Sequence, residues 1–575
     1  MQSYLQYRQF GNVARKRLVS TSNSRQYGPS PTLDGRQSPV GRSEETEVGS
    51  PTTEQKFDSE ALTTTNSHDQ PGESAAKKEI DLSDQPDGLI LVDWDDAYDP
   101  QMPKNYSYSK RLMATINVSL LGWVVGAASS INSGVSAQTV EAYHVSNVVG
   151  ALVTGLYLLG FAAGSLVSGP LSEILGRNFV YVGSLSLFMI FVMATALAPN
   201  IGAQLAFRFL TGVFGCPPLT CAGGTIADLW NPLEKTLYFP MYSVISFGGP
   251  VLGPVVASYI GQTGGLSWRW TSWLILIVSG AVLILLLLFQ PETYSPLLLK
   301  WKGQQFRKIT GDSRYRSEMD TEKIALFHRI GGAMKRQIMI TIHEPIILLI
   351  SLYMTILYIV LFTFFDGYTF IFRDTYGMSQ GLTNIIWVAM FVGIVLATLV
   401  IIPNYYITKK KFTQAAMEAK GADPATDSHA LDGVHTAPEI RLLFAMIGAP
   451  FIPISLFWMG WTDYASISVW SPIVASMCFG FGTICIFISS YMYVIDSYEI
   501  YAASALGFMT VSRYCAAGIM AIVGIPFYQN VGVHYTLTIL GCISAVMVPV
   551  PYVFYKYGPV IRRWSRYAMT EDVKV

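Results

Sequence analysis

The sequence predicts an all-α membrane protein whose twelve transmembrane helices form two six-helix bundles. The first observation is composition: of 575 residues, 51% are hydrophobic and only 14% are charged, whereas a soluble domain carries about 25% charged residues. The second is that apolar runs of spanning length, about 20 residues, begin near residue 111 and recur almost to the end of the chain. The third is that a charged segment separates these runs into two groups.

Each group contains six runs. The first group lies at 112–134, 148–169, 179–198, 203–226, 237–260 and 270–289, and the second at 345–366, 381–403, 441–461, 467–494, 502–525 and 534–556. The units are an N-terminal tail (1–110), a first bundle (111–289), a central loop (290–344), a second bundle (345–556) and a C-terminal tail (557–575). A miscount by one span is left open in the crowded stretch after Phe365.

The placement of Lys and Arg predicts the orientation, because cytoplasmic loops hold the excess of these residues. They precede the first span, follow the second, fourth, eighth and twelfth, and fill the central loop; on the other side Arg269 and Arg373 are the exceptions. Both termini are therefore expected in the cytoplasm. The N-terminal segment lacks the apolar core of a signal peptide.

Two polar segments are predicted to be disordered. Residues 1 to about 88 are rich in Ser, Thr, Gln and charged residues, and residues 404–440 form a polar insertion after the eighth span. The tail is either regulatory or an unremarkable solvated segment. The insertion is expected on the cytoplasmic side.

Several function classes find no support in the sequence. There is no HExxH, GxSxG or Walker A pattern, so we expect no enzyme, no metal site and no cofactor. Without a nucleotide-binding loop, uphill transport has to draw on an ion gradient. All six cysteines fall inside predicted spans, where buried thiols are the ordinary interpretation. Acids interleave the basic central loop, and we expect no nucleic-acid partner.

The short loop after the second span, GPLSEILGRN, has a spacing suited to a latch. Gly169 and Gly176 allow a tight turn and a close approach of helices. Glu173 and Arg177 are placed to pair with each other or with the N-terminal end of a neighbouring helix. Such a pair can close the cytoplasmic side and break when that side opens.

These residues resemble the signature of the major facilitator superfamily, with Glu173 where Asp is usual. The stretch RFLTGVFG, with Arg208, resembles the arginine motif of the same superfamily. The stretches LVDWDDAYDPQMPKNYSYSKR (91–111), WRWTSW (268–273), PETY (291–294) and DSYEIYAASALGFMTVSRY (496–514) resemble its fungal drug:proton antiporters, with Tyr106 where Trp is usual. The resemblance implies alternating access, an organic substrate exchanged against protons, and a monomer in the lipid bilayer.

The fifth span contains SFGGPVLGPVVASYIG, in which helix breakers stand among apolar residues. Gly249 and Gly253 form a GxxxG face for close helix packing, and Pro250 and Pro254 favour a bend. We expect a kinked helix that packs between the bundles. The pattern resembles the fifth-span motif of the antiporters, but Pro254 stands where a second glycine is usual, which leaves the direction of transport open.

Two charges inside the spans are candidates for function. Arg208 in the fourth span is costly unless it is paired, hydrated or able to reach the headgroups; the resemblance implies a role in proton coupling, and the alternative is an interfacial arginine. Asp366 ends the seventh span among aromatic residues, with Tyr353 and Tyr358 two to three turns earlier. An acid among aromatic rings suits an organic cation, and a membrane-edge acid beside an aromatic belt is the equal alternative.

Other polar residues are weaker candidates. Substrate contacts are proposed for Asn117, Asn132, Asn384 and Tyr491, although hydrogen bonds between helices and packing are the commoner roles. Asp228 is interpreted as a helix-end or gate residue, and Asp496 and Glu499 as loop charges.

The predicted function is a proton-coupled exporter of drugs or small organic cations, including polyamines, at the plasma membrane. An importer of polyamines or other small nitrogenous nutrients is the main alternative. A non-transporting membrane sensor is a minor one. The substrate, and the choice between plasma and vacuolar membrane, are left open.

Overall fold

The computed structural model describes residues 1–26, 89–96, 98–263, 265–321, 326–420, 437–498 and 502–565. In this part of the chain, twelve helical segments are long and apolar enough to cross a membrane, which confirms the predicted fold class. They are Tyr108–Tyr143, Asn147–Leu175, Arg177–Ala196, Ile201–Leu229, Lys235–Gln262, Trp270–Phe289, Pro345–Thr375, Gln380–Lys411, Pro438–Trp461, Trp470–Tyr498, Ala505–Val531 and Val533–Arg563.

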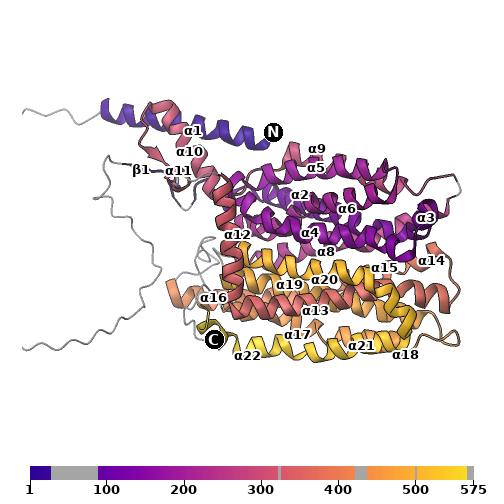
Figure 1. Ribbon diagram of the computed structural model, residues 1–575. Helices are drawn as coiled ribbons and strands as arrows, with labels where there is room; N and C mark the ends of the chain where they lie inside the picture. The colour runs from indigo at the N-terminus through magenta and orange to yellow at the C-terminus, as the bar shows by residue number, and fades with distance from the viewer. Residues whose placement is uncertain are drawn as a thin grey trace, which may run out of the picture.

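The first six spans form one bundle, drawn in purple and magenta in Figure 1. Their elements are α2 (Tyr108–Ser130), η3 (Ile131–Val135), α3 (Ser136–Tyr143), α4 (Asn147–Leu175), α5 (Arg177–Ala196), α6 (Ile201–Gly215), α7 (Pro217–Leu229), α8 (Lys235–Gln262) and α9 (Trp270–Phe289). The fourth span is divided into α6 and α7 at Cys216, because Pro217 and Pro218 supply no backbone N–H to continue the hydrogen-bond ladder.

The second bundle lies beside the first and is drawn in red to yellow. Its elements are α13 (Pro345–Tyr368), η4 (Thr369–Thr375), α14 (Gln380–Ile385), α15 (Trp387–Leu396), α16 (Thr398–Lys420), η5 (Pro438–Leu442), α17 (Leu443–Gly448), α18 (Phe451–Trp461), α19 (Trp470–Tyr498), α20 (Ala502–Val531), α21 (Val533–Met547) and α22 (Pro549–Arg563). Helices α4 and α20 form a large contact between the bundles.

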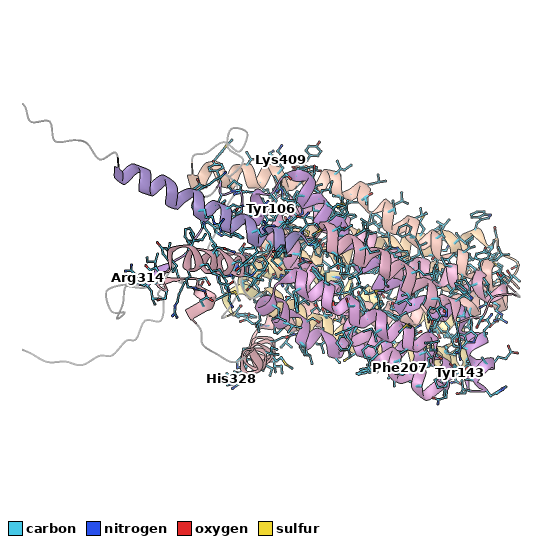
Figure 2. The ribbon with its side chains drawn as sticks, turned by 90° about the horizontal axis from the view of Figure 1, so that it is seen from above. Tyr106, Tyr143, Phe207, Arg314, His328 and Lys409 are labelled. Atoms are coloured by element: carbon cyan, nitrogen blue, oxygen red, sulfur yellow. The ribbon has the colours of Figure 1, made fainter. Side chains whose placement is uncertain are left out.

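The remaining elements gather at one end of the bundles, which we call the bridge end (Figure 1). They are α1 (Gln2–Gln26), β1 (Ile90–Leu91), η2 (Pro103–Asn105), α10 (Ser295–Thr310), β2 (Tyr315–Arg316), α11 (Glu318–Thr321) and α12 (Leu326–His343). In the view from above, Tyr106 and Arg314 lie toward this end, and Tyr143 and Phe207 lie toward the opposite, distal end (Figure 2).

The N-terminal helix α1 departs from the prediction of disorder for residues 1 to about 88. It packs along α10, with Phe10 and Ala14 buried and Tyr7 edge-on to Trp301. The prediction was wrong for these residues because their few apolar side chains are buried against another segment of the bridge end, which composition does not reveal. Residues 27–88 lie outside the described residues.

The insertion after the eighth span is likewise helical in its first part. Helix α16 continues the span to Lys420, and residues 421–436 lie outside the described part of the chain. The predicted loop therefore begins later than 404, because the sequence from Thr408 to Lys420 favours helix despite its charge.

The segment before the first span is fixed to the central loop. Strands β1 and β2 pair in parallel. The ammonium group of Lys302 lies 2.5 Å from Asp95 and 3.4 Å from Asp99, and the Lys302 side chain is only 3% exposed. This buried cluster holds the residues before α2 against α10.

The fifth span is one continuous helix despite Pro240, Pro250 and Pro254. A Cβ added at Gly249 would overlap the carbonyl oxygen of Trp123, and one at Gly253 would meet Ala127, both on α2. The small-residue face therefore packs within the first bundle. The expected packing between bundles falls one residue away, at Gly248, which faces Phe391 of α15.

Candidate functional site

Two neighbouring hollows lie between the bundles. The larger, the distal cavity, has a volume of about 340 Å³; the smaller, the central pocket, has about 60 Å³. Both are lined by residues of both bundles, and both include Pro250, Phe362 and Phe365 in their walls. A ligand held there touches both bundles at once.

The distal cavity contains the acid that the sequence singled out. Asp366 on α13 is partly buried, and its buried Oδ2 atom has no hydrogen-bond partner. A Cβ added at Gly524 of α20 would overlap that oxygen, so the missing side chain leaves room for the carboxylate. Phe362, Phe365, Tyr368, Phe370 and Trp387 share the cavity wall. The structure therefore places Asp366 on an aromatic-lined cavity.

The two tyrosines expected beside Asp366 lie elsewhere. Tyr358 lines the central pocket. Tyr353 lines a separate small cavity within the second bundle, with Ile452 and Met547. The expectation that both tyrosines accompany Asp366 is wrong, because residues two to three turns away on α13 point to different surfaces of the helix.

The asparagine candidates separate in the same way. Asn132 and Asn384 both line the distal cavity. Neither amide atom of Asn132 has a hydrogen-bond partner, whereas Asn384 accepts from Trp387 Nε1 at 3.2 Å and donates to the carbonyl of Gln380. Asn117 is buried in α2, and its Nδ2 has no partner. Asn132 is thus the amide most available to a ligand.

Arg208 faces the interior of the first bundle. Its Nη1 donates to the carbonyl oxygen of Ala128 at 2.9 Å, and its guanidinium lies 5.8 Å from the ring centre of Tyr157. The side chain is 4% exposed, which contradicts the alternative of an interfacial arginine. It borders a cavity of about 10 Å³ with Thr195 and Ser272, apart from both hollows.

The loop between α4 and α5 is built around Arg177. Its Nε lies 3.4 Å from Asp228 at the end of α7, and its Nη1 donates to Ser172 at 2.5 Å. Gly176 has a φ of +92°, and a Cβ there would collide with Glu292. Ser172 in turn donates to the carbonyl of Gly169. Arg177 therefore pairs with Asp228 on another helix of the same bundle, and Asp228 is the helix-end residue expected.

Glu292 has a structural role that sequence reasoning missed. Its carboxylate accepts backbone N–H groups from Arg177 at 2.9 Å and Asn178 at 3.1 Å, which caps the start of α5. It also accepts from Thr293 and Tyr294. Burial raises the pKa of Glu292 and the four N–H groups oppose that rise. The sequence PETY (291–294) gives no sign of this cap, because the capped N–H groups of α5 lie more than 100 residues earlier in the chain.

The bundles are joined at the bridge end by charges. Asp496 at the end of α19 lies 3.0 Å from Lys235 of α8 and 2.6 Å from Arg441 of η5. Arg441 also donates to Thr236 and to the carbonyl of Pro232, both in the first bundle. The interpretation of Asp496 as a loop charge is wrong, since it accepts from both bundles. Glu499 lies outside the described residues.

The distal end is joined by neutral amides. Gln380 Nε2 donates to the carbonyl of Gly134 at 2.5 Å. Gln138 Nε2 donates to Gln380 Oε1 at 3.1 Å. Polar contacts between the bundles thus exist on both sides of the two hollows.

Arg513 on α20 is the central residue that sequence reasoning missed. Its guanidinium lies 4.8 to 5.4 Å from the ring centres of four aromatic residues: Tyr358, Phe487, Tyr491 and Tyr514. Such contacts offset about 0.5–2 kcal/mol each, whereas a buried arginine costs several kcal/mol. Arg513 could have been identified from the sequence, because it is a lone cation in an apolar span, near the end of the stretch 496–514.

Tyr491 belongs to this cage rather than to the distal cavity. It stacks near Phe487, with ring centres 4.4 Å apart, and its hydroxyl lies 3.4 Å from Thr510. Tyr491 is not among the residues that line either hollow, so its contact with substrate stays a prediction.

Comparison with known proteins identifies the fold and its relatives. The MFS-type transporter kojT of Aspergillus flavus is 49% identical over 478 residues, which cover 83% of this chain and 82% of that protein. The MFS-type efflux pump MFS2 of Trichophyton rubrum is 34% identical over 484 residues, which cover 84% and 78%.

A solved structure of the proton:xylose symporter XylE, bound to 6-bromo-6-deoxy-D-glucose, has the same fold. It superposes with a TM-score of 0.55 at 15% identity, and covers 79% of this chain and 96% of that one. The family model of the Major Facilitator Superfamily matches residues 118–522. With its twelve spans and its cavities between two bundles, this chain is a membrane transporter that belongs to the major facilitator superfamily.

Proposed function

We propose that this transporter exports small organic compounds across the plasma membrane in exchange for protons, as a monomer with both termini in the cytoplasm. The observation that carries the proposal is the pair of hollows between the bundles, whose walls combine aromatic rings with unpartnered polar atoms of Asp366, Asn132 and Arg513. Pockets of this kind suit small organic ligands, because apolar walls supply affinity and a few polar groups supply orientation.

Alternating access explains how such a site moves its ligand. The ion pairs of Asp496 at the bridge end and the amide contacts of Gln380 at the distal end close opposite sides of the hollows. Breaking one set while keeping the other exposes the hollows to one side of the membrane. Neither set is covalent, so each can re-form in every cycle.

The export direction is supported by one relative that carries the name efflux pump. The basic residues that concentrate at the bridge end, where α10 and α12 lie, support a cytoplasmic location for that end. Protons are the proposed coupling ion because buried ionisable side chains, Asp366 and Arg208, lie within the spans.

Asp366 supports a cation as one substrate class, including cationic drugs and polyamines. Asp366 lines a cavity with five aromatic residues in the wall and has one carboxylate oxygen without a partner, and cations bind to such surfaces. The exporter proposal does not depend on this class, because the central pocket presents the opposite charge.

A flux measurement in both directions tests export. Cells that overexpress the protein, and matched cells without it, are loaded with labelled spermidine or a labelled cationic drug, and efflux and initial uptake are recorded. We expect faster efflux that a protonophore abolishes. Faster initial uptake in cells that were not preloaded would contradict export and favour the importer, and unchanged flux in both directions with every compound would favour the sensor.

A further inference from the structure

The structure assigns a second ligand group to this transporter: we propose that Arg513, in its aromatic cage, binds the acidic group of a small planar organic anion in the central pocket. The inference rests on the proposed transport function and names a substrate class for it. A carboxylate on a flat ring is the chemistry that this site fits.

Two nitrogens of the Arg513 guanidinium lack hydrogen-bond acceptors. Arg513 is 1% exposed, and its Nε and Nη1 have no hydrogen-bond partner. Aromatic rings stabilise the positive charge through their faces but accept no strong hydrogen bond from the N–H groups. A buried arginine with unused donors is stable when something else supplies the acceptors, and a bidentate anion does so best.

The charge of the central pocket favours an anion. None of the residues lining the central pocket is acidic, and Arg513 is the one cation among them. Asp366 lies in the wall of the distal cavity instead. The hydroxyl groups of Ser243 and Ser246 already donate to backbone carbonyls of Phe239 and Ser119. An organic cation in this pocket therefore meets repulsion and gains no ion pair.

The shape of the pocket wall favours a flat ligand. Aromatic rings surround the pocket from both bundles: Phe161, Tyr242, Phe247, Tyr358, Phe362, Phe365, Phe487 and Tyr514. Phe161 and Tyr358 contact Tyr514 edge-on, with ring centres 5.2 Å and 5.6 Å away. Flat ligands stack on such walls. Phe161 belongs to the first bundle and Tyr514 to the second, so an anion on Arg513 links the two bundles.

Arg208 is a useful contrast, because it is also an arginine buried within a bundle. It donates to the carbonyl of Ala128 and borders a cavity of about 10 Å³. A protein acceptor is thus already in place for Nη1 of Arg208, although its Nε has no partner. The absence of such an acceptor at Arg513, together with the larger pocket beside it, distinguishes a ligand site from a structural arginine.

Equilibrium binding to the purified full-length protein tests the proposal, with benzoate, benzamide and benzylamine as probes. They share one ring and differ in charge. We expect wild type to bind benzoate more tightly than benzamide, whereas benzylamine reports on the separate distal cavity with Asp366. Arg513→Gln should weaken benzoate binding about tenfold or more and change benzamide binding by at most about twofold. The benzoate affinity of Arg513→Lys should lie between those of wild type and Arg513→Gln. Arg314→Gln removes an exposed arginine that pairs with Asp312 and should leave all three unchanged.

Other results overturn the proposal. It fails if wild type binds benzoate no more tightly than benzamide or binds neither of them, or if Arg513→Gln binds benzoate as wild type does. Should Arg513→Gln not fold, Arg513→Lys is the deciding variant, because it keeps the charge but loses the planar fork. The site is then contradicted if the affinities of Arg513→Lys for benzoate and for benzamide change by the same factor relative to wild type.

Exchange of labelled probes in proteoliposomes without a pH gradient separates this inference from the proposed function. Benzoate binding without exchange of any probe would overturn transport and keep the anion site. Exchange of benzoate that is equally fast in wild type and Arg513→Gln would keep transport and overturn the anion site. We expect exchange of benzoate that Arg513→Gln slows about tenfold.

Discussion

Lys235 of the first bundle and Asp496 of the second lie 3.0 Å apart at the bridge end. Arg441 approaches the other oxygen of Asp496 at 2.6 Å and reaches back to Thr236 and Pro232. One carboxylate thus holds two cations from different bundles. A two-state transporter needs such a contact, because a small number of polar groups then decides whether this side is closed.

Replacing Asp496 with asparagine should open the bridge end. Removing one partner from a largely buried charge cluster costs about 3 kcal/mol, enough to move the balance between closed and open states by roughly a hundredfold. Spin labels at the bridge ends of α8 and α19 report the opening as a shift to longer distances between the two labels. Asp312→Asn, which breaks a pair within the central loop, is the control. An unchanged distance distribution would show that the ion pairs of Asp496 do not hold the bridge end closed.

Gly249→Ala should destabilise the first bundle. Its methyl group would overlap the carbonyl of Trp123 and crowd Ala127, and overpacking of this kind costs about 1–3 kcal/mol. Thermal unfolding in detergent measures the loss. Gly183→Ala in α5 meets no atom within 4 Å and should be neutral or slightly stabilising. Equal melting temperatures for the two variants would show that α2 and α8 are not so closely packed.

Glu292→Ala should loosen the start of α5. It removes the acceptor for the N–H groups of Arg177 and Asn178, and a lost cap costs about 1–2 kcal/mol. Glu292→Gln keeps one acceptor oxygen and should lose less. Hydrogen exchange at the first turn of α5 reports the local effect. Protection equal to wild type in Glu292→Ala would remove the cap from the account.

Asp463, in the distal loop between α18 and α19, should make stability depend on pH. Burial raises its pKa to about 6 from 3.8, although Thr375 donates to it and His534 lies near. The folded state therefore holds the proton more tightly than the unfolded state, so this stabilisation is complete below pH 3.8 and is lost as pH rises through about 6.

Asp463→Asn removes that titration. The fall in melting temperature from pH 4 to pH 6.5 should be smaller in the variant by an amount that corresponds to at most about 3 kcal/mol. Thr375→Val, which removes the hydrogen bond that lowers the pKa, should extend the fall to higher pH. Identical pH profiles for wild type and Asp463→Asn would contradict the assignment.

Asp366→Asn should weaken transport of cations more than that of neutral compounds. The carboxylate is free on one oxygen and lies on the distal cavity, so a cation loses an ion pair and a neutral ligand does not. Initial rates for a matched cationic and neutral pair measure the difference, which we expect at about tenfold. An equal loss for both compounds would remove Asp366 from recognition.

The sequence predicted the fold class well, because the length of an apolar helix and the grouping of runs follow directly from the bilayer. It also identified Asp366, Asn132 and Asn384, which the structure brings to one cavity. These residues are polar atoms in apolar spans, and their cost makes them visible in sequence.

What the sequence did not predict depends on partners far away along the chain. Helix α1 is ordered by α10, Glu292 by the start of α5, and Asp496 by Lys235 of the other bundle. Arg513 is visible as a charge, but its cage combines side chains of α13, α19 and α20. Side-chain packing decides which face of a helix meets which neighbour, and the periodicity of the sequence does not reveal that choice.

The most direct test of proton-coupled export uses purified protein in vesicles with an imposed pH gradient. The probes carry permanent charges, benzenesulfonate and 1-methylpyridinium, so that passive weak-acid or weak-base partition does not contribute. Exchange against protons predicts that at least one of them accumulates in vesicles with an acidic lumen, and that a protonophore abolishes the accumulation. Accumulation in vesicles with an alkaline lumen, or uptake that ignores the gradient, would contradict the account.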